Sequence, residues 1–234
     1  ASWAARVPLV AESLRLDTSQ VGALLFGGAI GSIAGLVASG HLVALFGARR
    51  VMLITLLIAP VSLFLAAVGA TVVDSFALAF AALAVYGAAF GTCDVAMNVS
   101  GAANERALGR ATMPVYHAFF SIGTIVGAGL GALAELLSVP FAVHIGTIGV
   151  VTIVAIVTVV RFVQPEDPDE AIPSDDAPHD QSTWRTRVAI WRDPATYFIG
   201  LIVLGMAFAE GSANDWLAYA MVTGHGTDAP TGAQ

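Results

Sequence analysis

Lysine is absent from the chain, and cysteine occurs once, at Cys93. The ten basic residues are therefore all arginine, and they stand against 17 acidic residues, for a formal charge of −7. This balance argues against a nucleic-acid-binding protein, which needs a basic surface. A single cysteine also excludes an internal disulfide framework and a cysteine zinc site. We expect neither a cofactor nor a bound metal.

Charged residues are scarce as well. They make up 12% of the 234 residues, whereas 57% are hydrophobic, and a water-soluble domain of this size has a more polar composition. About 20 apolar residues are needed for a helix to cross the hydrocarbon core of a bilayer, roughly 30 Å thick. The sequence contains six such runs, which predict an all-α integral membrane protein, a polytopic helical bundle. The predicted spans are 21–46, 51–73, 76–100, 115–137, 141–162 and 196–219.

The distribution of arginine predicts the orientation of these spans. Only Arg6 and Arg15 fall on one side of the membrane, and by the positive-inside rule the side with the other eight is cytoplasmic. Both ends of the chain then face outward, and we expect a multi-pass protein of the bacterial inner membrane. The eight are Arg49, Arg50, Arg106, Arg110, Arg161, Arg185, Arg187 and Arg192.

The longest connection, 164–194, has two parts of different character. Its first part mixes acids with prolines and cannot bury a core, so it predicts a flexible cytoplasmic linker. In its second part Trp184, Val188 and Trp191 share one helical face, which is typical of an amphipathic helix at the membrane surface. A partly ordered loop with apolar anchors is the alternative.

The pattern of spans and one local motif carry a resemblance. After the first span, Gly40 and Gly47 flank His-Leu-Val-Ala-Leu-Phe, and Ala48, Arg49 and Arg50 come next. This segment resembles the cytoplasmic loop signature of the major facilitator superfamily (MFS), which reads glycine, three residues, Asp-Arg, any residue, glycine, then basic residues. The Asp-Arg pair is replaced here by Ala-Leu. The two glycines would allow a tight turn, and the arginines would hold the loop at the anionic inner surface.

Carriers of this family have two six-helix halves joined by a long cytoplasmic loop. The resemblance implies an MFS-type bundle with six of an expected twelve transmembrane helices present, numbers 2 to 7. It also divides the chain into five segments: 1–20, the outer end of helix 1 and a periplasmic loop; 21–163, the N-terminal bundle of helices 2 to 6; 164–194, the linker with its amphipathic segment; 195–223, helix 7; and 224–234, an outer loop.

A finer resemblance rests on residues 91–121, from the end of the third predicted span into the fourth. Gly91 to Asn98, then Glu105, Gly109-Arg110 and His117 to Ser121, look like an uncharacterised bacterial branch distantly akin to sugar permeases of the fucose type.

Ionisable residues inside a bilayer cost at least about 2.5–3.5 kcal/mol each near its centre, so each needs a partner, a watery cavity or a function. Asp94 and Asn98 are four residues apart and project from one helical face. An acid in a partly dry cavity suits a proton-coupled carrier, and we hypothesise that Asp94 binds the proton or the solute. The alternative is an acid near the cytoplasmic helix end that caps the helix or pairs with a loop arginine.

The last span carries Glu210, Asn214 and Asp215. The resemblance places helices 1, 4, 7 and 10 around a central cavity, which agrees with the polar residues of the third and last spans. The sequence after Gly205 predicts an interruption of this helix, with Glu210 and Asn214 lining the cavity or an outer gate. Alternatively, Asp215 and the adjacent tryptophan mark the outer membrane interface.

Two further side chains inside spans have weaker assignments. His117 shares a face with Ser121 on the fourth span and is a candidate binding residue, although a helix-packing role is favoured. We expect Glu135, near the outer end of the same span, to reach the membrane interface.

These features predict a secondary-active carrier and no enzyme. A small polar solute, together with a proton, would be moved by alternating access, and we expect a monomer. Two alternatives stay open. One is a non-transporting membrane sensor or scaffold that uses the linker as its partner surface. The other, less favoured, is an intramembrane protease, because neither Gly-x-Ser-Gly nor Gly-x-Gly-Asp occurs at a suitable position.

Overall fold

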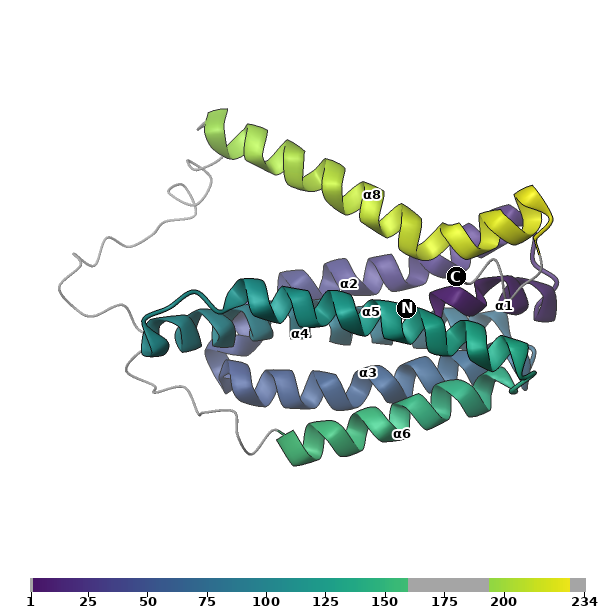
Figure 1. The fold of residues 1–234 in the computed structure, drawn as a ribbon, viewed down its shortest axis with the longest axis horizontal. Helices are drawn as coiled ribbons and strands as arrows, with labels where there is room; N and C mark the ends of the chain where they lie inside the picture. Colours follow the sequence, from purple (N-terminus) through teal and green to yellow (C-terminus); the bar gives the residue numbers. More distant parts are fainter. Residues whose placement is uncertain (1, 160–193, 228–234) are drawn as a thin grey trace.

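The computed structural model describes residues 2–159 and 194–227, and every regular element within them is helical (Figure 1). The predicted all-α fold is therefore confirmed. The predicted amphipathic segment with Trp184 and nearly all of the predicted linker lie outside the described residues. The elements are η1 (Ala4–Arg6), α1 (Val7–Ser13), α2 (Thr18–Phe46), α3 (Ala48–Thr71), α4 (Phe76–Leu108), α5 (Met113–Leu136), α6 (Phe141–Val159) and α8 (Pro194–His225).

Six of these helices, α2 to α6 and α8, are long and apolar enough to cross a membrane. They coincide with the six predicted spans, but some boundaries differ. The helix predicted to end at residue 100 continues to Leu108, where Gly109 in the left-handed conformation (φ 61°) terminates it. A hydropathy pattern predicts which residues lie in the bilayer and does not predict where the helix ends. It therefore misses the polar turns that extend α4 beyond the apolar run.

The start of α2 is set by a capping box. The Asp17 carboxylate accepts a hydrogen bond from the Gln20 backbone N–H (2.9 Å), and the Gln20 side chain accepts one from the Asp17 N–H (2.9 Å). The Ser19 hydroxyl also donates to this carboxylate (2.6 Å). These bonds favour the charged form, and the Ser19 hydroxyl contributes most to lowering the pKa of Asp17 below its ordinary value.

Replacing Asp17 by alanine is expected to lower the melting temperature, because the Gln20 backbone N–H and the Ser19 hydroxyl both lose their acceptor. The lowered pKa means that the carboxylate stabilises the fold above the ordinary Asp pKa of about 3.9 and loses this effect as the pH falls through the folded-state value. Melting curves of the two proteins should therefore differ at pH 7 and converge below about pH 3.9. A gap that persists at acid pH would contradict the assignment.

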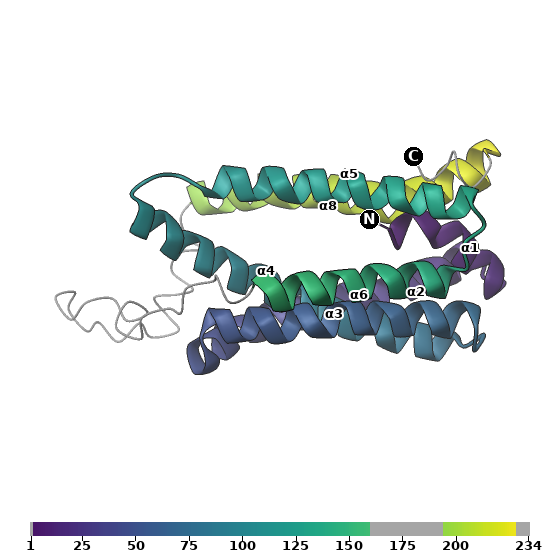
Figure 2. The same cartoon turned by 60° about the horizontal axis from the view of Figure 1, so that its bottom comes forward.

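The helices form two layers (Figure 2). One layer contains α2, α3, α4 and α6, and the other contains α5 and α8, with η1 and α1 between them at one end. We call this end, which holds Thr18, the outer end, in keeping with the orientation predicted from the arginines. The opposite end, where α2 meets α3, is the inner end.

Helices α2 and α4 approach each other so closely that side chains are excluded from part of their interface. A Cβ atom at Gly31 would collide with the backbone carbonyl of Ala84, and one at Gly87 would collide with the backbone of α2. At the inner side of this contact the Thr92 hydroxyl donates a hydrogen bond to the Gly35 carbonyl (3.1 Å). The small residues thus allow backbone-to-backbone packing in an environment without a hydrophobic driving force between helices.

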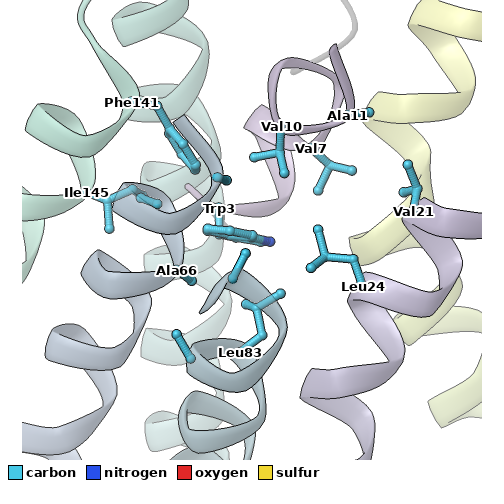
Figure 3. Close-up of a cluster of buried hydrophobic side chains, with 14 of the residues drawn as sticks. Trp3, Val7, Val10, Ala11, Val21, Leu24, Ala66, Leu83, Phe141 and Ile145 are labelled. Carbon is cyan, nitrogen blue, oxygen red and sulfur yellow. The ribbon is translucent and has the colours of Figure 1, made fainter. Parts of the chain in front are cut away.

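A second core closes the outer end, and Trp3 lies at its centre (Figure 3). The Trp3 ring packs against Phe141 of α6, with 5.2 Å between ring centroids. Because this tryptophan enters from η1, the N-terminal segment fills the space between the layers at this end. We call the group the Trp3 cluster; its buried members include Val7, Val10, Val21, Leu24, Ala66, Ala79, Leu83, Ile145 and Tyr219.

Candidate functional site

One face of α4 runs from the Trp3 cluster toward the inner end of the protein. Its residues succeed each other at intervals of three or four positions, so they form one line along the helix. Near the outer end this line is buried under η1 and α1, and farther inward it becomes exposed. Because Leu83 packs in one cluster with Trp3 and Val7, this side of α4 is turned toward the N-terminal segment, which lies between the layers. We call it the α4 stripe; it consists of Ala79, Leu83, Tyr86, Phe90, Asp94 and Met97.

Aromatic rings occupy the stripe next to its carboxylate. The rings of Tyr86 and Phe90 stack with their centroids 5.9 Å apart and their planes at 25°. Phe90 is 43% exposed although it lies near the middle of a membrane-spanning helix. The sequence reasoning missed both residues, yet their four-residue spacing ahead of Asp94 is the signal that could have found them.

Asp94 itself is exposed on the stripe. Asn98 is near it, but the Asn98 amide donates to the backbone carbonyl of Asp94 (2.9 Å) rather than to the carboxylate. In the described part of the chain, no hydrogen bond or ion pair reaches the Asp94 carboxylate. The alternative in which an arginine of the loop neutralises this acid therefore has no support among those residues.

The remaining polar candidates lie on the second layer. His117 on α5 and Glu210 and Asn214 on α8 are all exposed. Within residues 2–159 and 194–227, which the structure describes, no hydrogen bond or ion pair joins these three side chains to another helix. The only described polar contact near His117 is made by its backbone, whose carbonyl accepts a hydrogen bond from Ser121 (3.1 Å).

The predicted interruption of the last helix is wrong. Helix α8 runs without a break from Pro194 to His225, through Gly205 and Glu210. Its only proline is the first residue, where no intrahelical N–H is needed, and isolated glycines weaken a helix without ending it. Figure 1 shows instead a change of direction in the outer part of α8.

Helix α8 meets the rest of the protein at the outer end. The hydroxyl groups of Thr18 on α2 and Tyr219 on α8 are hydrogen bonded (3.3 Å), and the Trp216 ring lies against Gly22. Asp215, adjacent to this tryptophan, is exposed. The structure therefore places one of the α8 candidates at the outer end, next to the contact with α2. We call the α2–α8 contact the outer seam.

The residues of the predicted loop motif lie in three places: at the end of α2, in the turn after it and at the start of α3. Gly40 lies inside α2, so a turn at this residue is wrong, because the helix continues to Phe46. Gly47 is the single residue between α2 and α3 and has a φ of 77°, a conformation that favours glycine. Arg49 and Arg50 are in the first turn of α3.

At the outer end, Glu135 of α5 forms an ion pair with Arg6 of η1. The Arg6 side chain is only 2% exposed and that of Glu135 18%, so the acid expected to reach the membrane interface is paired with a buried arginine. Arg6 also donates to the Val139 carbonyl (3.2 Å), and its guanidinium lies 5.5 Å from the centroid of the Phe141 ring. This arginine ties the N-terminal segment to the turn between α5 and α6.

Six apolar spans in two layers define a polytopic helical membrane protein with carboxylates inside its spans. The comparisons identify its family. The sequence profile of the Major Facilitator Superfamily matches residues 2–231, nearly the whole chain, and the chain belongs to this superfamily.

Two curated relatives are similar over most of the chain. An uncharacterized MFS-type transporter of Yersinia pestis is 31% identical over 224 residues, which are 95% of this chain and 54% of the relative. An uncharacterized transporter of Sinorhizobium fredii is 28% identical over 222 residues, 93% of this chain and 54% of the relative. The chain thus spans about half the length of the curated relatives it matches. No solved structure matches it.

Proposed function

We propose that this chain is part of a secondary-active carrier of the bacterial inner membrane. The carrier moves a small polar solute by alternating access and couples this movement to protons. It acts as a monomer, catalyses no reaction and belongs to a branch distantly akin to the fucose-type sugar permeases. Within it, residues 21–163 belong to the first helix bundle, and α8 begins the second.

The observation that carries the proposal is the one-ended contact between α8 and the first bundle. At the outer end, α8 is joined by the Thr18–Tyr219 hydrogen bond and by Trp216 on Gly22. Toward the inner end α8 diverges from α2 (Figure 1). A first helix of the second bundle that contacts the first bundle at one end and diverges from it at the other supports a carrier that is open toward one side of the membrane.

The outer seam borders a half-open groove. This groove of about 340 Å³ lies between α1, the end of α5 and α8. Its lining includes the charged residues Glu12, Arg15 and Glu135 together with Tyr219. A contact that borders a partly polar groove can separate at lower cost than a filled apolar core, which supports the role of the seam as an outer gate.

Asp94 is the acid we assign to coupling. It lies within a membrane span on the exposed part of the α4 stripe, and no described residue neutralises it. A carboxyl in such a place can take up a proton from one side and release it to the other when the bundles rock. Glu210, Asn214 and Asp215 on α8, and His117 on α5, are proposed to contribute to the same pathway.

Replacing Asp94 by asparagine is expected to abolish proton-driven uptake while counterflow exchange continues, because exchange needs no net proton movement. The full-length protein is reconstituted in liposomes that contain the pH dye pyranine, and sugars, amino acids and amines are added outside in turn. A solute that acidifies the lumen is then used, radiolabelled, for counterflow in wild type and variant.

The matched control is Asp74→Asn, which removes an exposed carboxylate in the outer α3–α4 turn at a position (φ 56°) that asparagine also tolerates. It should leave both uptake and counterflow unchanged. Unaltered acidification by the Asp94→Asn protein would refute the coupling role. Absence of flux and of counterflow for every solute, in a folded protein, would refute the carrier and favour a membrane sensor.

A further inference from the structure

Away from their terminal turns, the described spans carry charges of one sign. The chain has no lysine, and the arginines of the described spans, Arg49, Arg50 and Arg106, lie in the terminal turns of α3 and α4 at the inner end. Glu105 and Glu135 also lie in terminal turns, whereas the carboxylates farther inside the helices are Asp94 of α4 and Glu210 and Asp215 of α8. An anionic solute between these helices would meet like charge, and a cationic one would meet opposite charge.

The α4 stripe offers a cation two kinds of attraction. Stacked aromatic rings present negative faces, and a cation near such a face gains about 0.5–1 kcal/mol, or more where water is excluded. Asp94 follows Phe90 by four residues, slightly more than one helical turn, a rise of about 6 Å along the helix. An ammonium group at the Asp94 carboxylate therefore places an attached apolar body on the exposed Phe90 ring.

The second layer extends this arrangement. Asp215 of α8 is an exposed carboxylate next to Trp216, whose ring lies against Gly22. The second layer thus also carries a carboxylate within a membrane-spanning helix. A positively charged solute would be attracted by both layers.

The hydrogen-bonding groups of the stripe fit a neutral sugar less well. A sugar is held by several convergent amide and hydroxyl groups, because each of its hydroxyls needs a partner. The amide nearest to Asp94, that of Asn98, already donates to the backbone of its own helix. The stripe itself otherwise carries only the Tyr86 hydroxyl and the Asp94 carboxylate as polar groups.

We propose that the solute is an organic cation, an amine or ammonium compound with an apolar body, bound between the Asp94 carboxylate and the Tyr86–Phe90 rings. This inference rests on the proposed carrier function and gives its solute a chemical class. It also departs from the sugar class that the fucose-type resemblance implies.

Three probes that share a phenylethyl group and differ in the charge of their head group test the charge preference. Binding of phenethylammonium, 2-phenylethanol and 3-phenylpropanoate to the purified full-length protein is measured by isothermal titration calorimetry. We expect the ammonium compound to bind at least about tenfold more tightly than the alcohol or the carboxylate, a difference of about 1.4 kcal/mol. Tighter or equal binding of either of the other two probes, or absence of ammonium binding, would overturn the inference.

Variants assign the preference to the stripe. Asp94→Asn should reduce ammonium affinity about tenfold and leave alcohol affinity unchanged, and Phe90→Leu should reduce ammonium affinity about threefold. Asp94→Glu, which keeps the charge, should keep the preference, and Asp74→Asn should match the wild type. Melting curves show that each variant is folded. A preference that survives in folded Asp94→Asn protein would remove this residue from the site.

The two proposals fail in different ways. Selective ammonium binding without uptake or counterflow of any ammonium compound would refute the carrier and keep the cation site. Proton-driven uptake of sugars or anions without ammonium binding would keep the carrier and refute the cation site.

Discussion

Replacing Gly31 by alanine is expected to lower the free energy of unfolding by about 3 kcal/mol. The added methyl group would occupy the place of the Ala84 carbonyl, so α2 and α4 would have to separate along their closest contact. Backbone atoms cannot rotate away as a side-chain end can, and the separation would also strain the Thr92–Gly35 hydrogen bond. The measurement is unfolding of the detergent-purified protein by SDS titration, monitored by tryptophan fluorescence.

Gly123→Ala is the matched control. This glycine also lies within a membrane-spanning helix, α5, but a Cβ at its position meets no atom within 4 Å. Its replacement should leave the free energy of unfolding within about 1 kcal/mol of the wild type, since alanine is the better helix former. Equal losses for the two variants would show that the close α2–α4 contact does not determine stability.

Replacing Glu135 by leucine is expected to cost about 3–5 kcal/mol, because it leaves the buried Arg6 guanidinium without its counter-charge. The double variant Arg6→Met, Glu135→Leu should regain most of this loss, since an apolar pair of similar size carries no unpaired charge. The same SDS titration measures both. The single and double variants thus separate the cost of an orphaned charge from the value of the pair itself.

An exposed acid at the same end serves as the reference for this pair. Glu12 lies in α1 and makes no ion pair with any described residue. Glu12→Gln should change the free energy of unfolding by less than about 1 kcal/mol. A double variant as unstable as Glu135→Leu alone would show that Arg6 contributes through its other contacts, such as the Val139 carbonyl.

The sequence predicted the helices well because each span has to satisfy its backbone hydrogen bonds internally, so a long apolar run has one solution. The sequence predicts helix ends and breaks less well where polar and apolar residues are mixed within one helix. The polar last turns of α4 predict an end at residue 100, and Gly205 with the polar segment that begins at Glu210 predicts a break in α8, yet both helices continue. Polar residues at these positions change the solvent preference of the helix and not its backbone conformation.

The candidate site was predictable in part. Asp94 was identified as an ionisable residue at membrane depth, and the four-residue spacing placed Asn98 near it, but spacing could not tell that the Asn98 amide bonds to backbone. The Arg6–Glu135 pair and the Thr18–Tyr219 bond join residues more than a hundred positions apart. Such contacts depend on how the layers are stacked, which helical periodicity does not encode.

The outer seam has a consequence for the balance between states. Its specific links are one hydrogen bond between two hydroxyl groups and one indole ring resting on a glycine. These two links contribute about 1–3 kcal/mol, and the burial of Tyr219 in the Trp3 cluster adds to them. In the proposed carrier, a bound solute would therefore have to favour the separated form by more than these links contribute in order to reverse the ratio of the two forms.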